Sequence, residues 1–168
     1  PGVLGHNPGF VARPPYDPAA AKALLDKFGY VDRDKDGWRE LPDGKPFTIV
    51  MASTPSARDR ERDELWKKNM TTLGIRIDFL KQKWPDLLRM GRAGKLQMWP
   101  VGWINTYGEG DAFMQLLYSR NIGQSNYSRF ALPEYDELYR KTKRLPDGAE
   151  RNAVYRKMAE LVAAYNPW

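Results

Sequence analysis

The sequence predicts an α/β fold, because segments with strand character alternate with segments of helical periodicity. Residues 45–51 are mostly apolar and partly β-branched, and residues 75–79 alternate between apolar and polar side chains. Longer segments whose apolar residues recur at helical spacing lie before and after each of these predicted strands. A third apolar and aromatic run, residues 97–103, follows a third helical segment. The predicted order is therefore helix and strand three times over, then a loop and three further helices.

The helices are predicted from residues that favour helix ends. Asp17 is suited to accept hydrogen bonds from the first backbone N–H groups, and Pro18 suits the first helical position. Gly29 ends this helix, and Gly74 ends a second one over residues 57–73. Further helices are predicted to begin near Pro85, Ala112, Pro133 and, after a sequence like a capping box at 147–150, residue 149.

Length and composition fit one globular domain behind a short arm. Residues 1–16 are rich in Gly and Pro and predict an extended arm or linker, and residues 17–168 form the domain. We expect the apolar stripes of the helices, with Leu24, Phe28 and Leu65 among them, to lie in its core.

The composition argues against several function classes. The formal net charge is +6, but basic and acidic side chains are interleaved, as in residues 58–64, which is typical of a solvated helix face rather than a nucleic-acid-binding surface. No apolar run approaches the ~20 residues that span a membrane. Cysteine is absent and His6 is the only histidine, so we expect no disulfide, no Cys- or His-based metal site and no cofactor.

Residues 32–37 have the D-x-D-x-D-G spacing that begins an EF-hand calcium loop. The twelfth position is Asp43 rather than the usual Glu, Pro42 precedes it, and a predicted strand follows instead of a helix. Asp and Gly in this pattern are also typical of a surface loop built from Asx turns. We favour the surface loop, and the calcium alternative stays open.

The candidate binding residues gather in the stretch 97–113. Aromatic, amide and hydroxyl side chains follow the third predicted strand: Trp103, Asn105, Thr106 and Tyr107. Loops beyond the carboxyl ends of strands are where α/β proteins bind ligands, and pockets are built from such side chains. Glu109 and Asp111 are the carboxylates beside this loop and are candidates for acid/base roles. The alternative is that Trp99 and Trp103 are core residues.

Short motifs spread along nearly the whole chain carry a family resemblance. They are Tyr16-Asp17-Pro18, Asp34-Lys35-Asp36-Gly37, Asp43-Gly44-Lys45-Pro46, Leu73-Gly74-Ile75, Trp84, Gly102-Trp103, Asn126, Pro133-Glu134-Tyr135-Asp136 and Glu150-Arg151. In order and spacing they resemble the family 5 extracellular solute-binding proteins, of the dipeptide- and oligopeptide-binding type.

The resemblance implies that residues 17–168 are most of the C-terminal lobe of a two-lobed receptor. Its fold would be the type II fold of periplasmic binding proteins, with a small mixed sheet flanked by helices. Such receptors close around a solute by a hinge and deliver it to the membrane permease of an ABC importer. The implied solutes are peptides or peptide-like compounds, in the periplasm or outside the cell on a membrane tether. We expect the other lobe and the export signal upstream of Pro1.

By the same resemblance, Trp84 and Trp103 wall the binding cleft. Peptide-binding members carry an Asp three residues after the second Trp, where it pairs with the ammonium group of the ligand. This sequence has Thr106 there, and a hydroxyl cannot neutralise a buried ammonium. Either Asp111 or Glu109 substitutes, or the solute has no free amine. The predicted ligand-binding residues are Trp84, Trp103, Asn105, Thr106, Tyr107 and Asp111.

Other functions stay open beside this prediction. One is an importer receptor for a non-peptide solute. Another, from a different class, is a hydrolytic enzyme that uses Glu109 and Asp111, and a third is a structural or interaction module. We expect no catalysis, because the sequence offers neither a His-containing catalytic triad nor a Gly-rich phosphate loop.

Overall fold

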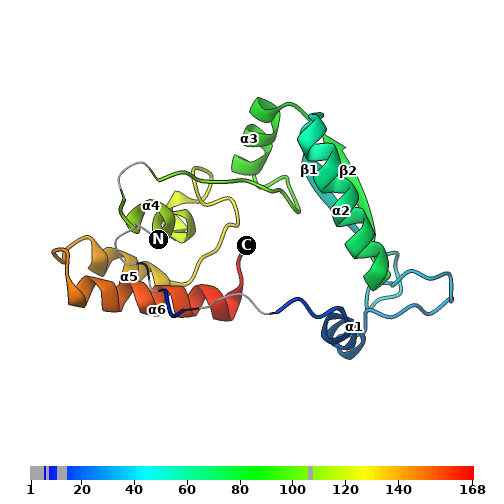
Figure 1. The fold of residues 1–168 in the computed structure, drawn as a ribbon, viewed down its shortest axis with the longest axis horizontal. Helices are drawn as coiled ribbons and strands as arrows, with labels where there is room; N and C mark the ends of the chain where they lie inside the picture. The colour runs from blue at the N-terminus through cyan, green and yellow to red at the C-terminus, as the bar shows by residue number, and fades with distance from the viewer. Residues whose placement is uncertain (1–5, 7, 11–14, 106–107) are drawn as a thin grey trace. The chain divides into compact units, whose positions relative to one another are not determined.

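The computed structural model describes residues 6, 8–10, 15–105 and 108–168. These residues form two compact units, which are coloured along the chain in Figure 1. The first, called the sheet unit, contains Pro15–Met90 and Lys95–Pro100. The second, called the helical unit, contains Gly91–Gly94 and Val101–Trp168.

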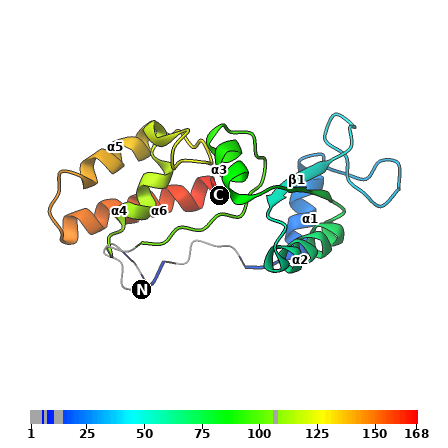
Figure 2. The same cartoon turned by 90° about the horizontal axis from the view of Figure 1, so that it is seen from above.

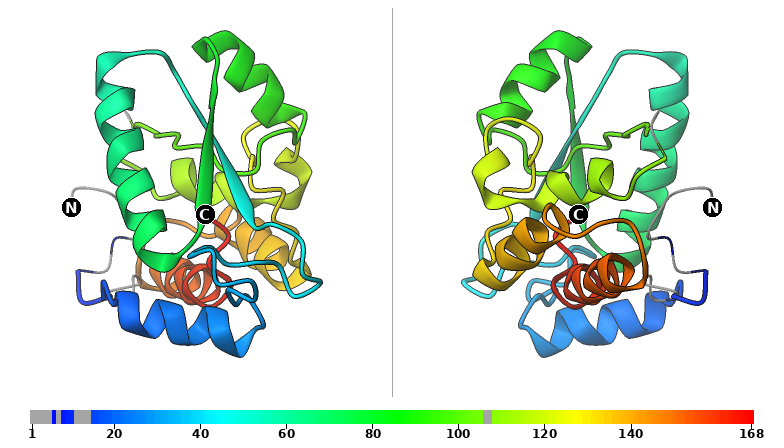
Figure 3. Two further views of the ribbon diagram at one scale, coloured as in Figure 1. Left: turned by 90° about the vertical axis from the view of Figure 1, so that its right-hand side faces the viewer. Right: turned by 90° about the vertical axis from the view of Figure 1, so that its left-hand side faces the viewer.

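A parallel pair of strands forms the centre of the sheet unit. Strand β1 (Thr48–Ser53) pairs with β2 (Arg76–Lys81), and helix α2 (Ala57–Leu73) connects them. Figure 3 shows α2 running alongside the two strands. A parallel pair needs a crossover connection of this kind, and the 17 residues of α2 supply it. The buried hydrophobic residues of this unit are Met51, Ala52, Ile75 and Leu87.

The predicted helix ends are confirmed in the sheet unit. Helix α1 (Pro18–Lys27) begins after Asp17, whose side chain accepts a hydrogen bond from the backbone N–H of Ala20 at 2.9 Å. Helix α2 ends at Gly74, which has φ = 73°, a left-handed conformation that glycine adopts without steric cost. Helix α3 (Trp84–Arg92) follows β2.

The third predicted strand is mostly wrong. Within residues 97–103, the structure shows a single parallel bridge between Met98 and Met51, with a hydrogen bond of 2.8 Å from the N–H of Ala52 to the carbonyl of Met98. Pro100 has no N–H to donate and so interrupts the ladder. The small sheet is therefore parallel and two-stranded, rather than mixed.

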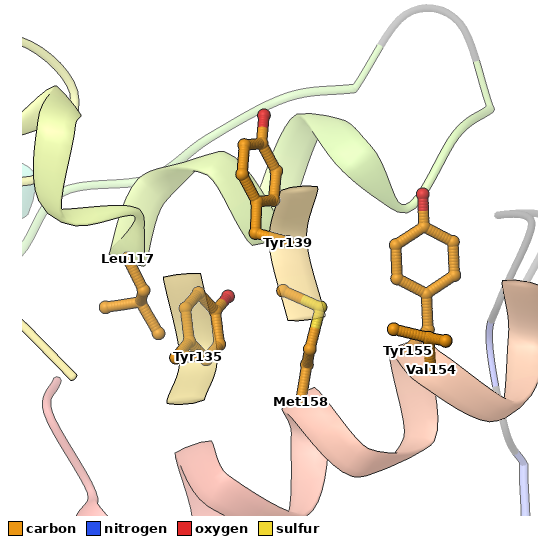
Figure 4. Packing of buried hydrophobic residues seen from close by; sticks show 6 residues of the cluster. All are labelled: Leu117, Tyr135, Tyr139, Val154, Tyr155 and Met158. Atoms are coloured by element: carbon orange, nitrogen blue, oxygen red, sulfur yellow. The ribbon is translucent and has the colours of Figure 1, made fainter. Parts of the chain in front are cut away.

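The helical unit is built on two adjacent helices, α5 (Pro133–Thr142) and α6 (Ala149–Tyr165), which lie side by side in Figures 1 and 2. Helix α4 (Asp111–Met114) and 3₁₀ turns at Gln115–Leu117 and Ser119–Asn121 precede them. Their shared core, drawn in Figure 4, consists of Leu117, Tyr135, Tyr139, Val154, Tyr155 and Met158. The helix expected from Ala112 to about Tyr118 is thus a short α-helix continued by 3₁₀ turns.

Two expectations about the helices are wrong. Leu24 and Phe28 of α1 and Leu65 of α2 are exposed rather than in the core. Asp147 does not cap α6: Gly148 is the N-cap residue without a side-chain hydrogen bond, and Asp147 instead accepts one from Arg151. None of the described helices is long and apolar enough to cross a membrane.

Candidate functional site

Trp84, the first predicted wall residue, lies at the beginning of α3 in the sheet unit. Its side chain is half exposed, at 47%, and its ring centroid lies 5.3 Å from that of Trp99. The first turn of α3 is held by hydrogen bonds from the N–H groups of Asp86 and Leu87 to the carbonyl of Lys83, and the Leu87 side chain is fully buried. The buried leucine thus anchors the helix end that presents an aromatic pair to the surface.

Trp103, the second predicted wall residue, lies in the helical unit and is 38% exposed, so it is not a core residue. Its ring stacks on Tyr127, with centroids 6.0 Å apart and an interplanar angle of 22°. Asn126 fixes the segment that carries Tyr127: it is buried, and its amide donates to the carbonyls of Tyr118 (3.1 Å) and Phe130 (2.9 Å). Tyr127 was not among the predicted site residues, although the aromatic insertion in a polar segment was a signal for it.

Asn105 has a local partner in the loop after Trp103. Its side-chain amide donates a hydrogen bond to the backbone carbonyl of Glu109, four residues later. Thr106 and Tyr107 lie outside the described residues. A ligand-binding role for Asn105 stays a prediction.

Both carboxylates beside the loop are paired with cations of the same unit. Oδ2 of Asp111 lies 2.6 Å from Nζ of Lys143, and Oε2 of Glu109 lies 3.6 Å from a guanidinium nitrogen of Arg151. Burial alone would lower the pKa of Arg151, but its hydrogen bond with Asp147 and the surrounding negative charges outweigh burial and raise this pKa. Arg151 is therefore a permanent cation, which Glu109 shares with Asp147, whereas Asp111 pairs with Lys143.

The Asp-rich loop folds into the expected turns. The N–H groups of Asp36, Gly37 and Trp38 donate to the side chains of Asp34, Asp32 and Asp36, at 3.1, 2.9 and 2.8 Å respectively. Carboxylate oxygens of Asp32, Asp34, Asp36 and Glu40 lie within 4.8 Å of one another. Asp43, which the EF-hand spacing places at the twelfth position, instead pairs with Lys45 at 2.6 Å.

A family model describes this chain. The model of the bacterial extracellular solute-binding proteins, family 5 (middle region), matches residues 1–125. The chain belongs to this family. The resemblance seen in the sequence is thereby confirmed.

Curated relatives include Heme-binding protein A of Haemophilus influenzae, 30% identical over 156 residues, which span 92% of this chain and 27% of the relative. The periplasmic oligopeptide-binding protein OppA of Escherichia coli is 25% identical over 91% of this chain and 29% of its own length. The chain thus spans less than a third of the length of these relatives.

Solved structures of type II periplasmic binding proteins share the fold of this family 5 chain. HbpA2 from Haemophilus parasuis has a TM-score of 0.82 and 23% identity, covering 98% of this chain and 31% of its own. DppA from Helicobacter pylori, in complex with the peptide STSA, has a TM-score of 0.81 and 25% identity, covering 99% and 30%. The predicted fold class is therefore confirmed.

Proposed function

We propose that this chain is part of a solute-binding receptor that captures peptides or peptide-like solutes and delivers them to the membrane permease of an ABC importer. The observation that carries the proposal is the pair of half-exposed tryptophans, Trp84 and Trp103, each backed by an aromatic ring of its own unit. Stacked rings at a surface offer apolar area that is costly to leave in water and favourable to cover with a solute. The receptor would work in the periplasm, or outside the cell on a membrane tether.

The charges near Trp103 refine the solute class. Asp111 is paired with Lys143 and Glu109 with Arg151, so these carboxylates are already engaged and are poorly placed to serve as the counter-charge of a ligand ammonium. Thr106 supplies no charge either. We therefore propose that the loop does not depend on a free α-amine, which extends the candidates to blocked peptides and to non-peptide solutes.

The same ion pairs weigh against the enzyme alternative. General acid/base catalysis needs a carboxyl group that contacts the substrate, and both carboxylates beside the loop are already engaged in ion pairs, Asp111 with Lys143 and Glu109 with Arg151. We propose that the solute is bound and released unchanged.

Isothermal titration calorimetry on the full-length protein tests this proposal, with trialanine and N-acetyl-trialanine as probes. We expect both peptides to bind with affinities within about threefold of each other, and Trp84→Ala or Trp103→Ala to weaken binding roughly tenfold or more. Trp38→Ala is the matched control, because this ring lies against Arg76 and belongs to neither of the two aromatic pairs. Unchanged affinity in both site variants would contradict the proposal, and loss of binding on acetylation would contradict the refined solute class.

A further inference from the structure

The segment that follows Trp103 is held at its far end by two cations. Lys143, the C-cap residue of α5, pairs with Asp111 at 2.6 Å. Arg151 of α6 pairs with Glu109 at 3.6 Å and, more closely, with Asp147 just before the helix. The two cations and the two loop carboxylates, Asp111 and Glu109, belong to the helical unit. They are called the loop clamp here. The clamp joins the start of α4 to the helix pair that carries the core.

The cations of the clamp rest on core residues. Nζ of Lys143 lies 5.3 Å from the ring centroid of Tyr139, and the guanidinium carbon of Arg151 lies 5.4 Å from that of Tyr155. Both rings are buried, and the hydroxyl group of Tyr155 points toward the ribbon where α4 begins in Figure 4. A cation over an aromatic face is attracted by the ring quadrupole. Each cation therefore contacts a core ring on one side and a carboxylate of the loop on the other.

Burial determines which way a residue of the loop clamp would move if its ion pair were lost. The side chains of Arg151 and Asp111 are 12% and 19% exposed, and Oδ1 of Asp111 is buried without a hydrogen bond to any described residue. A carboxylate in this position that lost Lys143 would be drawn toward water, because a partly buried charge is costly without its counter-charge. Such a movement would displace the chain at the start of α4.

The displacement would reach Trp103 through the contact between Asn105 and Glu109. Asn105 donates to the carbonyl of Glu109, so a shift of Glu109 is passed to Asn105, two residues after Trp103. We infer that Lys143 and Arg151 are positioning residues: without contacting the solute, they set where the Trp103 ring stands and thereby the affinity of the receptor. The link to affinity rests on the function proposed above, whereas the link to the Trp103 ring does not.

The experiment compares charge-removing and charge-conserving variants of the full-length protein labelled with 5-fluorotryptophan. The fluorine resonance of Trp103 is assigned by its loss in Trp103→Phe. We expect Lys143→Met and Arg151→Met to move or broaden this resonance and to weaken trialanine binding roughly three- to thirtyfold. Lys143→Arg and Arg151→Lys should restore both, and the resonances of Trp38 and Trp66 should stay in place.

Lys141→Met is the matched control. Lys141 lies two residues before Lys143 and pairs with Glu150 of α6 at 3.3 Å rather than with Glu109 or Asp111. An unchanged Trp103 resonance in both clamp variants would overturn the inference, as would an equal change in Lys141→Met. If the resonance moves but trialanine binds neither the wild type nor the variants, the positioning role stands, and the peptide function fails.

Discussion

The rings of Trp103 and Tyr127 lie 6.0 Å apart at an angle of 22°, although 23 positions of sequence separate them. The contact joins the loop before α4 to the segment before α5. Stacked aromatic pairs contribute about 0.5–1.5 kcal/mol beyond the area that they bury. Tyr127 therefore helps to hold the partly exposed Trp103 ring in place.

Replacing Tyr127 tests this support. We expect Tyr127→Ala to weaken trialanine binding by the full-length protein roughly two- to tenfold, because the Trp103 ring loses its stacking partner. Tyr127→Phe keeps the ring and should bind as the wild type does. Calorimetric titration measures both variants, and equal affinities for Tyr127→Ala and the wild type would show that the stack does not serve the site.

Asn126 should contribute to stability rather than to binding chemistry. Its buried amide satisfies the carbonyls of Tyr118 and Phe130, so Asn126→Ala leaves both without this donor. We expect a loss of about 1–3 kcal/mol in the free energy of unfolding, measured by urea denaturation. Gln124→Ala, at an exposed position of the same segment, serves as the control and should change the stability little. A similar loss in both variants would count against the assigned role.

The start of α2 should be sensitive to acid through Asp59. The Thr54 hydroxyl and N–H donate to this carboxylate at 2.5 and 2.8 Å, and the hydroxyl hydrogen bond is the main reason why the pKa of Asp59 lies below its ordinary value. A folded-state pKa below the unfolded value gives stability that is present above the unfolded pKa and is lost as pH falls through the folded pKa.

Asp59→Asn should therefore destabilise the full-length protein by about 1–2 kcal/mol at pH 7. The difference from the wild type should shrink below pH ~4, where the unfolded carboxyl already begins to bind its proton. Urea denaturation between pH 3 and 7 measures the two curves. A difference that stays constant over this range would mean that the charge of Asp59 is not involved.

A second buried carboxylate, Asp63 of α2, depends on a cation. It accepts a hydrogen bond from the Ser53 hydroxyl at 2.9 Å and pairs with Lys81, with its own side chain only 4% exposed. We expect Lys81→Met to cost about 2–4 kcal/mol in the free energy of unfolding, because it leaves a buried charge without a partner. Adding Asp63→Asn to this variant removes the charge and should recover part of the loss. A double variant that is less stable than Lys81→Met alone would contradict this explanation.

Most of the fold could be predicted from local signals. Asp17 and Gly74 identify helix ends because capping depends on short-range hydrogen bonds and backbone angles. The prediction of a third strand was wrong because residues 97–103 have the apolar composition of a strand but contain Pro100, which limits backbone pairing to a single bridge. Exposed Leu24 and Phe28 show that helical spacing predicts an apolar face but not what covers it.

The candidate site was only partly predictable. Trp84 and Trp103 stand out as aromatic residues at element ends, and the structure leaves both half exposed. The stacking of Tyr127 on Trp103 and the pairing of Asp111 with Lys143 join segments more than 20 residues apart. No spacing rule connects such positions, since tertiary packing decides which of them meet.

Native mass spectrometry of the full-length protein, purified without unfolding, tests the central claim most directly. We expect a non-covalent complex whose bound mass is released on denaturation and is chemically intact. If nothing co-purifies, added trialanine or N-acetyl-trialanine should produce the complex. A protein that stays ligand-free with both probes, or that returns them cleaved, would contradict the account of a solute receptor.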